Sequence, residues 1–182
     1  MRIIAGEARG LPLTAPPAGV RPTMDRVRAA IFSSLGDAVP GAKVLDLFAG
    51  SGAMGIEALS RGAASAVFVD LNPRSVQCVR DNLRKAKFDA SVQTMDAIKF
   101  MELYASDGFD LIFADPPYAK YESDRDFAAE LLQMPQTAAA LNPAGTLILE
   151  RSPRREEPEG VLLSLLRARR YGKSEIAYYI AR

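Results

Sequence analysis

The sequence predicts an α/β fold with a mostly parallel sheet, helices on both faces and an antiparallel hairpin at the end. Between residues 43 and 150, short apolar and often β-branched runs alternate with helix-length segments, as in consecutive βαβ units. Two strand-like runs, 163–170 and 175–181, then follow with no helix between them, so the last strands should pair antiparallel. The chain has 182 residues, 48% of them hydrophobic, enough for one domain with a small extension.

The segment before this alternation is expected to form a separate small extension. Residues 1–14 suggest a short β-hairpin with Gly10 near its turn, and residues 15–19 a proline-rich linker. Thr23 is placed to cap a helix over residues 24–35. We therefore expect the extension over residues 1–40 and the main α/β domain over residues 41–182.

The main domain is expected to carry five strands before the final hairpin. Each is short and apolar and is preceded or followed by turn residues: 43–48, 64–70, 90–94, 109–114 and 146–150. The segments between them have the length of helices, and Pro135 should interrupt the last one. The predicted helices run from the glycine-rich turn to residue 61 and over residues 72–87, 97–104 and 123–141.

Composition excludes several kinds of chemistry. The chain has one cysteine, Cys78, and no histidine, so an internal disulfide, a zinc site and a histidine-based triad lack the residues they need. No apolar stretch reaches the length of a membrane span, and the first residues do not resemble a signal peptide. We expect a cytoplasmic monomer that binds no metal and no membrane.

Charge is divided unevenly along the chain. Residues 1–28 hold five arginines and two carboxylates, a net charge of +3, and residues 151–182 have a net charge of +4. The middle segment has a net charge of −6. Basic ends around an acidic centre suggest a polyanionic partner, although ordinary surface variation explains the pattern about equally well.

A glycine-rich loop follows the first strand of the main domain. Gly50, Gly52 and Gly55 let the backbone approach a ligand before a helix begins. The spacing also fits the fingerprint of dinucleotide-binding proteins, so the glycines alone leave NAD open. Asp46, just before the loop, favours a ligand with a positive charge, because a carboxylate there would repel a pyrophosphate. The cofactor favoured by this site is S-adenosylmethionine.

Two further aspartates end neighbouring strands of the predicted sheet. Asp70 lies 20 residues after Gly50 and can accept both hydroxyls of a ribose, and Asp96 is suited to an adenine amino group. The predicted cofactor-binding residues lie in this loop and at these strand ends: Asp46, Phe48, Ala49, Gly50, Ser51, Gly52, Asp70, Asp96 and Ala97.

The sequence Asp115-Pro116-Pro117-Tyr118 follows the fourth strand and is the candidate catalytic loop. An exocyclic amine of a nucleobase is a weak nucleophile, and acceptors aimed at its hydrogens make its nitrogen more reactive. The Asp115 carboxylate and the Pro116 carbonyl can be those acceptors, while the two prolines fix the backbone. Tyr118 offers a ring on which a flipped base can stack. The loop therefore predicts methyl transfer to an amino nitrogen.

Together these features resemble class I methyltransferases that depend on S-adenosylmethionine and have a Rossmann-like fold. A narrower resemblance spans nearly the whole chain and rests on Ile3–Gly6, Arg9-Gly10, Val20–Arg28, Asp46–Gly52 and Asp115–Tyr118. These segments are similar to the bacterial RsmD family. The Arg-Pro-Thr-x-Asp-Arg-Val-Arg run is the most specific of them, because methyltransferases in general lack it.

The resemblance implies what the residues alone do not. Members of the family methylate N2 of one guanine in 16S ribosomal RNA, so the substrate would be the small ribosomal subunit or an assembly intermediate of it. Asp115 would engage the amine and Tyr118 would stack. Asp70 departs from the glutamate that the family often has there, and its shorter side chain has less reach. Five arginines of the extension are candidates for RNA contacts: Arg2, Arg9, Arg21, Arg26 and Arg28.

Two other classes of function remain open at this point. The first is a methyltransferase for DNA adenine or cytosine, or for a glutamine amide of a protein, which share related loops. The second is an RNA-binding assembly factor that keeps the fold without catalysis. Gly50, Gly52 and Asp115 argue against the second class, because a protein without catalysis would not need them.

Overall fold

The computed structural model describes residues 1–15, 25–119, 121, 124–154, 156–158 and 161–182. The chain divides into two compact units, Met1–Ala97 and Ile98–Arg182. This division does not coincide with the boundary near residue 40 that the sequence suggested. The extension instead belongs to the same unit as the glycine-rich loop.

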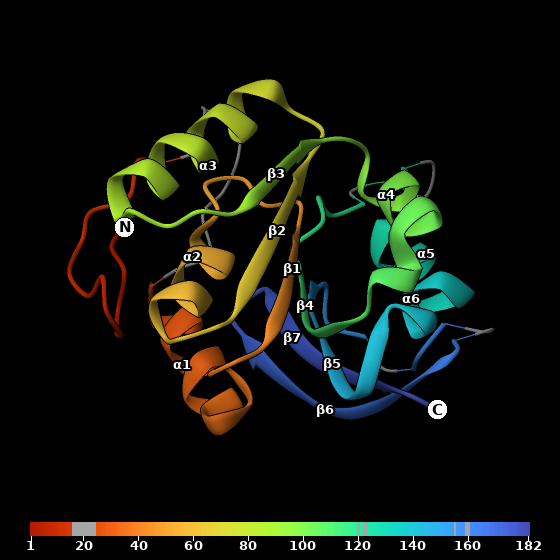
Figure 1. Cartoon of the computed structure of the whole chain (residues 1–182). Coiled ribbons are helices and arrows are strands. Elements are labelled where there is room, and N and C mark those ends of the chain that lie inside the picture. Colours follow the sequence, from red (N-terminus) through yellow and green to blue (C-terminus); the bar gives the residue numbers. More distant parts are fainter. Residues whose placement is uncertain (16–24, 120, 122–123, 155, 159–160) are drawn as a thin grey trace. The chain divides into compact units, whose positions relative to one another are not determined.

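The first unit contains three parallel strands in the order β3-β2-β1. The strands are β1 Lys43–Leu47, β2 Ser65–Asp70 and β3 Ser91–Thr94. They are short, and helices of the same unit cover one side of them (Figure 1). The helices alternate with the strands: α1 Asp25–Leu35, η1 Gly36–Ala38, α2 Ala53–Ser60 and α3 Pro73–Ala86. Asn72 caps α3 by accepting a hydrogen bond from the backbone N–H of Arg74, as the Asn-Pro pair suggests.

The N-terminal extension forms the predicted hairpin: Arg2 and Pro12 make an antiparallel bridge, and the Ile3 N–H donates across the hairpin to the Leu11 carbonyl at 3.0 Å. Gly10 has a positive φ of 85° and lies in the turn. The hairpin is fastened to α2 through its own backbone: the N–H groups of Ile4 and Ala5 donate to the Glu57 carboxylate, at 2.7 and 3.1 Å. These bonds explain why the extension and α2 form one compact unit. The predicted linker after Ala15 and the Thr23 cap lie outside the described residues.

The second unit contains two parallel strands and the C-terminal hairpin, in the order β4-β5-β7-β6. Three of the strands are longer than any strand of the first unit, and β4 is as long as β2. The four are β4 Phe109–Ala114, β5 Leu141–Arg151, β6 Leu163–Tyr171 and β7 Ser174–Ala181. The helical elements precede or separate them: α4 Ala97–Tyr104, η2 Ala105–Asp107, α5 Phe127–Gln133 and α6 Pro135–Ala139. The antiparallel pairings of β7 with β5 and β6 confirm the predicted terminal hairpin.

One strand begins earlier than the sequence predicts. β5 starts at Leu141, which pairs with Phe109, whereas its pattern predicts a strand only from Thr146. The segment between contains proline and glycine and reads as a loop, but the register shifts there between Phe109 and Leu111, as at a bulge. A Cβ on Gly145 would lie 2.7 Å from the Phe109 carbonyl oxygen. Glycine is therefore required by close backbone packing here.

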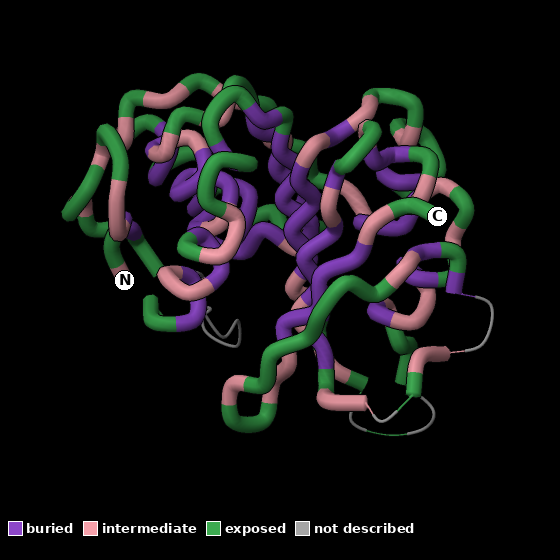
Figure 2. Tube along the Cα trace, turned by 90° about the horizontal axis from the view of Figure 1, so that it is seen from below, coloured by how far each residue is buried: buried purple, intermediate pink, exposed green. Residues whose placement is uncertain are grey.

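Buried residues gather along the strands in both units, while turns and the outer faces of helices are exposed (Figure 2). β1 and β4 are buried at nearly every position, as expected for parallel strands covered by helices. Within the described part of the chain, none of the helices has the length and apolar character needed to span a membrane.

Candidate active site

The glycine-rich loop makes a tight left-handed turn between β1 and α2. Phe48, Gly50 and Gly52 all have positive φ angles, of 58°, 57° and 75°. The Gly52 N–H donates to the Ala49 carbonyl at 2.7 Å, which closes the turn before α2 begins at Ala53. A side chain on Gly52 would be crowded, because its Cβ would lie 3.1 Å from Val79. The backbone of this loop is thus shaped by positions that favour glycine.

Asp70 holds this loop from the end of β2. Its Oδ2 accepts a hydrogen bond from the Gly50 N–H at 2.8 Å, and its Oδ1 accepts one from the Asn72 N–H at 2.8 Å. Each carboxylate oxygen has a second lone pair, and the side chain is only half-buried. The carboxylate can therefore orient the loop and accept ligand hydroxyls at the same time.

Asp46 supports the loop from behind. Its side chain is buried, and its Oδ2 accepts a hydrogen bond from the Gly55 N–H in the first turn of α2, at 2.9 Å. A carboxylate near a helix N-terminus is favoured by the helix dipole. This contact fixes where α2 starts, while direct contact of Asp46 with a ligand stays a prediction.

Asp96 and Ala97 lie beyond β3, beside Asp70. The Met95 N–H donates to the Asp70 carbonyl at 3.1 Å, so the ends of β2 and β3 are joined directly before Asp96. Asp96 is half-buried and Ala97 is buried at the start of α4. Asp46, Asp70 and Asp96 lie at or just beyond the carboxyl ends of three neighbouring parallel strands. The first unit therefore gathers acidic side chains at the edge where α/β folds bind ligands.

Asn82 is a support of this loop that the sequence analysis missed. Its amide nitrogen donates to the carbonyls of Ser51 and Thr14, at 3.0 and 3.1 Å, and its oxygen accepts from the Thr14 N–H. The side chain is buried on the inner face of α3. An asparagine in a buried helical stripe was a signal, because a buried amide needs partners. Asn82 thereby connects the hairpin to the loop.

The Asp115–Tyr118 loop follows β4 in the second unit and is held by the tyrosine hydroxyl. The Tyr118 hydroxyl donates to Glu150 Oε1 at 2.9 Å and lies 2.7 Å from Ser174 Oγ. Glu150 is near the end of β5 and Ser174 begins β7, so both partners come from the sheet. Asp115 and Tyr118 are half-buried, and Pro116 is buried.

The surroundings of Tyr118 raise the pKa of its phenol. Burial raises the pKa of Tyr118 to about 12, and the nearby Glu150 carboxylate adds to the increase, whereas the hydrogen bond with Ser174 opposes it. The phenol therefore stays protonated near neutral pH and keeps its hydrogen bond to Glu150. Neither partner was identified from the sequence, because they lie 32 and 56 residues away.

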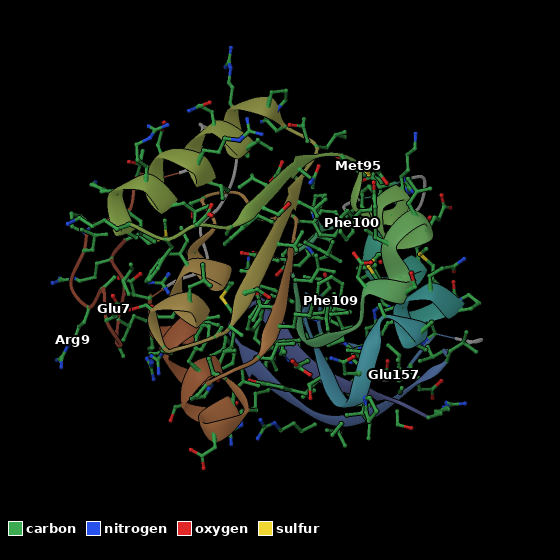
Figure 3. All side chains as sticks on the ribbon, in the orientation of Figure 1. Glu7, Arg9, Met95, Phe100, Phe109 and Glu157 are labelled. Atoms are coloured by element: carbon green, nitrogen blue, oxygen red, sulfur yellow. The ribbon has the colours of Figure 1, made fainter. Side chains whose placement is uncertain are left out.

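The candidate arginines of the extension differ in exposure. Arg2, Arg9 and Arg26 are exposed, and Arg9 points away from the hairpin into solvent (Figure 3). Arg21 lies outside the described residues. Arg28 is fully buried, which does not fit the expectation that it contacts RNA from the surface.

Arg28 instead lies in a buried charged cluster beneath the hairpin. Its Nε is 3.6 Å from Glu57, its Nη2 is 3.1 Å from Asp25, and it also donates to the Arg2 carbonyl. Glu57 is buried as well and accepts from Arg61 Nε at 2.8 Å. A guanidinium is almost never buried without a charged partner, so Glu57 explains its position. We assign Arg28 a structural role.

The family comparison covers nearly the whole chain. The family described as "Conserved hypothetical protein 95" matches residues 1–180. YlbH of Bacillus subtilis (strain 168), provisionally named an rRNA methyltransferase, is 36% identical over 98% of both chains. The protein named Ribosomal RNA small subunit methyltransferase D of Escherichia coli (strain K12) is 39% identical over 66% of this chain and 61% of its own.

Solved structures agree with the fold. The protein TTHA0928 of Thermus thermophilus has a TM-score of 0.80 and 31% identity, over 100% of this chain and 99% of its own. The Escherichia coli protein yhhF, provisionally titled a methyltransferase, has a TM-score of 0.73 and 31% identity over the same shares. SMU.776 of Streptococcus mutans, solved with bound SAH, is more distant: it has 18% identity and a TM-score of 0.66, and the match covers 85% of this chain and 48% of that one. At this identity the likeness shows the Rossmann-like fold alone.

Proposed function

We propose that this protein methylates N2 of a guanine in 16S ribosomal RNA. The premise is that the chain belongs to the Conserved hypothetical protein 95 family, which is the RsmD family that its sequence resembles. The methyl donor would be S-adenosylmethionine. The observation that supports this most strongly is the Asp-Pro-Pro-Tyr loop, whose tyrosine is tethered to the sheet in a chain that the family matches from residue 1 to residue 180.

The first unit supplies the residues that would bind the cofactor. The turn at Phe48–Gly52 presents backbone groups, and Asp70 is already aligned by the N–H groups of Gly50 and Asn72. We assign the ribose hydroxyls to Asp70 and the adenine amino group to Asp96, with Ala97 and Ser51 lining the site. The sulfonium would supply a methyl group that is activated before it is bound.

The second unit supplies the residues that would hold the base. The Asp115 carboxylate and the Pro116 carbonyl would accept hydrogen bonds from the guanine N2 amine, which would make its nitrogen more nucleophilic. Pro117 restricts the backbone, and the Tyr118 ring stacks on the flipped base. These groups work mainly by alignment, because methyl transfer from a sulfonium needs no covalent intermediate.

The exposed arginines of the extension would bind the phosphates of the RNA. Arg2, Arg9 and Arg26 have exposed side chains in the first unit, and Arg21 is included from the sequence. Contacts to phosphates orient a nucleic acid without reading its sequence, so they would position the subunit or its assembly intermediate for methylation.

A transfer assay tests the proposal. The protein is incubated with S-adenosylmethionine labelled in its methyl group and with small ribosomal subunits that lack the modification, and labelled nucleosides are separated after digestion. The expected product is N2-methylguanosine together with S-adenosylhomocysteine. Label on adenine, on cytosine or only on protein would contradict the guanine assignment, and a failure to bind S-adenosylmethionine in calorimetry would contradict an enzymatic function.

A further inference from the structure

Strand β6 forms the outer edge of the strands in the second unit and is largely exposed. Among the described residues it pairs only with β7, and its exposed run extends from Leu165 to Arg170. Three of these residues are arginines: Arg167, Arg169 and Arg170. Leu163, at the start of the strand, is buried in the core, whereas the side chains from Leu165 to Arg170 are not, so the basic character of this exposed run requires an explanation.

The pairing register places these arginines on different faces of the sheet. Side chains of directly paired residues share a face. Glu150 pairs with Ile176, which pairs with Arg169, so these three side chains form one row across β5, β7 and β6. In the same way, Arg151, Glu175 and Arg170 form a row on the opposite face.

Arg169 thereby lies on the face that holds the catalytic loop. Glu150 accepts the hydrogen bond of the Tyr118 hydroxyl, and Ser174, on the same face, is its second partner. Two spacings between neighbouring strands separate the backbones of Glu150 and Arg169, or about 10 Å. Arg167 shares this face, because it pairs with Tyr178 and its guanidinium lies 4.2 Å from the centre of that ring.

The charges of this face are suited to a polyanion. Several exposed or half-exposed arginines are paired with carboxylates, as in Arg84–Asp81, Arg125–Glu130 and Arg154–Asp126. Within the described parts of the chain, Arg169 forms no ion pair with a carboxylate. Its charge is therefore not neutralised by the protein itself and is available to a ligand.

We propose that Arg167 and Arg169 on β6 contact the phosphates of the RNA strand next to the target guanine. The inference rests on the proposed function, since it takes the base on Tyr118 as its starting point. A base stacked on Tyr118 leaves its neighbouring nucleotides within about one or two strand spacings, and β6 presents positive charge at that distance. The C-terminal hairpin would then add phosphate contacts to those proposed for the arginines of the N-terminal extension.

Charged residues on an edge strand also have a simpler use, which is to prevent pairing with another chain. That role needs charge on the strand but does not depend on which face carries it. The two explanations therefore predict different effects when neighbouring arginines on opposite faces are substituted. Arg169 and Arg170 are such a matched pair.

The experiment compares Arg169→Gln with Arg170→Gln. Binding of each full-length protein to an unmodified small-subunit ribosomal RNA transcript is measured across a series of salt concentrations. Arg169→Gln should weaken binding severalfold and lower the slope of log K against log salt by about one unit, the loss of one phosphate contact. Arg170→Gln should behave like the wild type, and Arg169→Lys should recover most of the slope.

Several results would overturn the inference without affecting the proposed function. These are an unchanged slope in Arg169→Gln, or equal losses in Arg169→Gln and Arg170→Gln, while the wild type still methylates the RNA. Increased self-association of both variants with normal RNA binding would assign β6 to edge protection instead. If the wild type bound neither S-adenosylmethionine nor RNA, the proposed function would itself be wrong. Thermal unfolding of each variant checks that the fold is kept.

Discussion

The two loops that the proposed reaction requires are held in place in different ways. The glycine-rich loop is held by carboxylates that accept hydrogen bonds from backbone N–H groups. Asp70 accepts hydrogen bonds from Gly50 and Asn72, and Asp46 accepts one from Gly55. The Asp115–Tyr118 loop is held from its last residue, by hydrogen bonds from a side chain to the side chains of Glu150 and Ser174.

The difference follows from what each loop would have to bind. A cofactor that is the same in every turnover is best served by a fixed backbone, and backbone N–H groups bonded to a charge form strong hydrogen bonds. A base that enters from an RNA needs a ring to stack on and an acceptor, and these are held by two prolines and a phenol. The comparison predicts that changes in the first loop affect cofactor binding, whereas changes in the second affect turnover.

The largest expected effect is on turnover, in Asp115→Ala. Loss of the carboxylate removes an acceptor for the amine, and we expect the transfer rate to fall by at least about a hundredfold, the size seen when a charge-stabilising group is removed. Cofactor affinity, measured by calorimetry, should be nearly unchanged. Asp89→Ala, at an exposed aspartate between α3 and β3, is the matched control. Near-normal turnover in Asp115→Ala would show that the role given to this residue is wrong.

The next effect is on cofactor affinity, in Asp70→Ala. The N–H groups of Gly50 and Asn72 would lose their acceptor, and the ribose hydroxyls would lose the carboxylate that is proposed to bind them. A hydrogen bond to a charged group contributes about 1.5–3 kcal/mol, so the dissociation constant of S-adenosylmethionine should rise by about 10- to 100-fold. Calorimetry measures it directly. An unchanged dissociation constant would mean that the loop binds no cofactor or is held by other groups.

A smaller effect is expected when the tether of Tyr118 is cut. Tyr118→Phe keeps the ring but loses the hydroxyl, and the transfer rate should fall by about two- to tenfold, the range of an ordinary hydrogen bond. Glu150→Gln should give a similar loss. The double variant should be little worse than either single variant, because both remove the same contact. Fully additive losses would show that Glu150 acts independently of Tyr118.

The smallest effect concerns pH. The pKa of Tyr118 is about 12 in the folded protein, above the ordinary tyrosine value of 10.0, because burial disfavours the phenolate. Stability linked to this group is thus fully present below about pH 10 and is lost as the pH rises toward 12. Burial also raises the pKa of Tyr179, so the difference between absorbance titrations of the wild type and Tyr118→Phe is needed to isolate the ionisation of Tyr118. Ionisation near the ordinary value would contradict the burial of the Tyr118 hydroxyl.

Local patterns predicted most of the fold, because the spacing of apolar side chains that distinguishes strands from helices can be recognised from neighbouring residues. The three parallel strands of the first unit and the terminal hairpin follow the predicted ranges to within one or two residues. The Asn72-Pro73 pair indicated the start of α3 through chemistry confined to three residues. The aspartates at the strand ends could also be foreseen, since parallel strands end on the same edge.

Contacts between distant segments could not be predicted in this way. Arg28 looked like a surface arginine, because nothing near it in the sequence shows that Glu57 lies beside it. Glu150 and Ser174 have no local mark that connects them with Tyr118. The early start of β5 depends on pairing between Leu141 and Phe109, which overrides a proline- and glycine-containing segment that reads as a loop.

The way in which the N-terminal hairpin is fastened has a consequence for protein engineering. The Glu57 carboxylate and Ser60 accept hydrogen bonds from the backbone of residues 4–8, and a Cβ on Gly6 would lie 1.7 Å from the Ser60 carbonyl oxygen. Asn82 does the same for Thr14. Residues 1–15 are therefore not a transplantable module. Grafted onto another methyltransferase, they would need a glutamate, a serine and an asparagine supplied by the recipient's helices, and a chimera without them would leave backbone groups without acceptors.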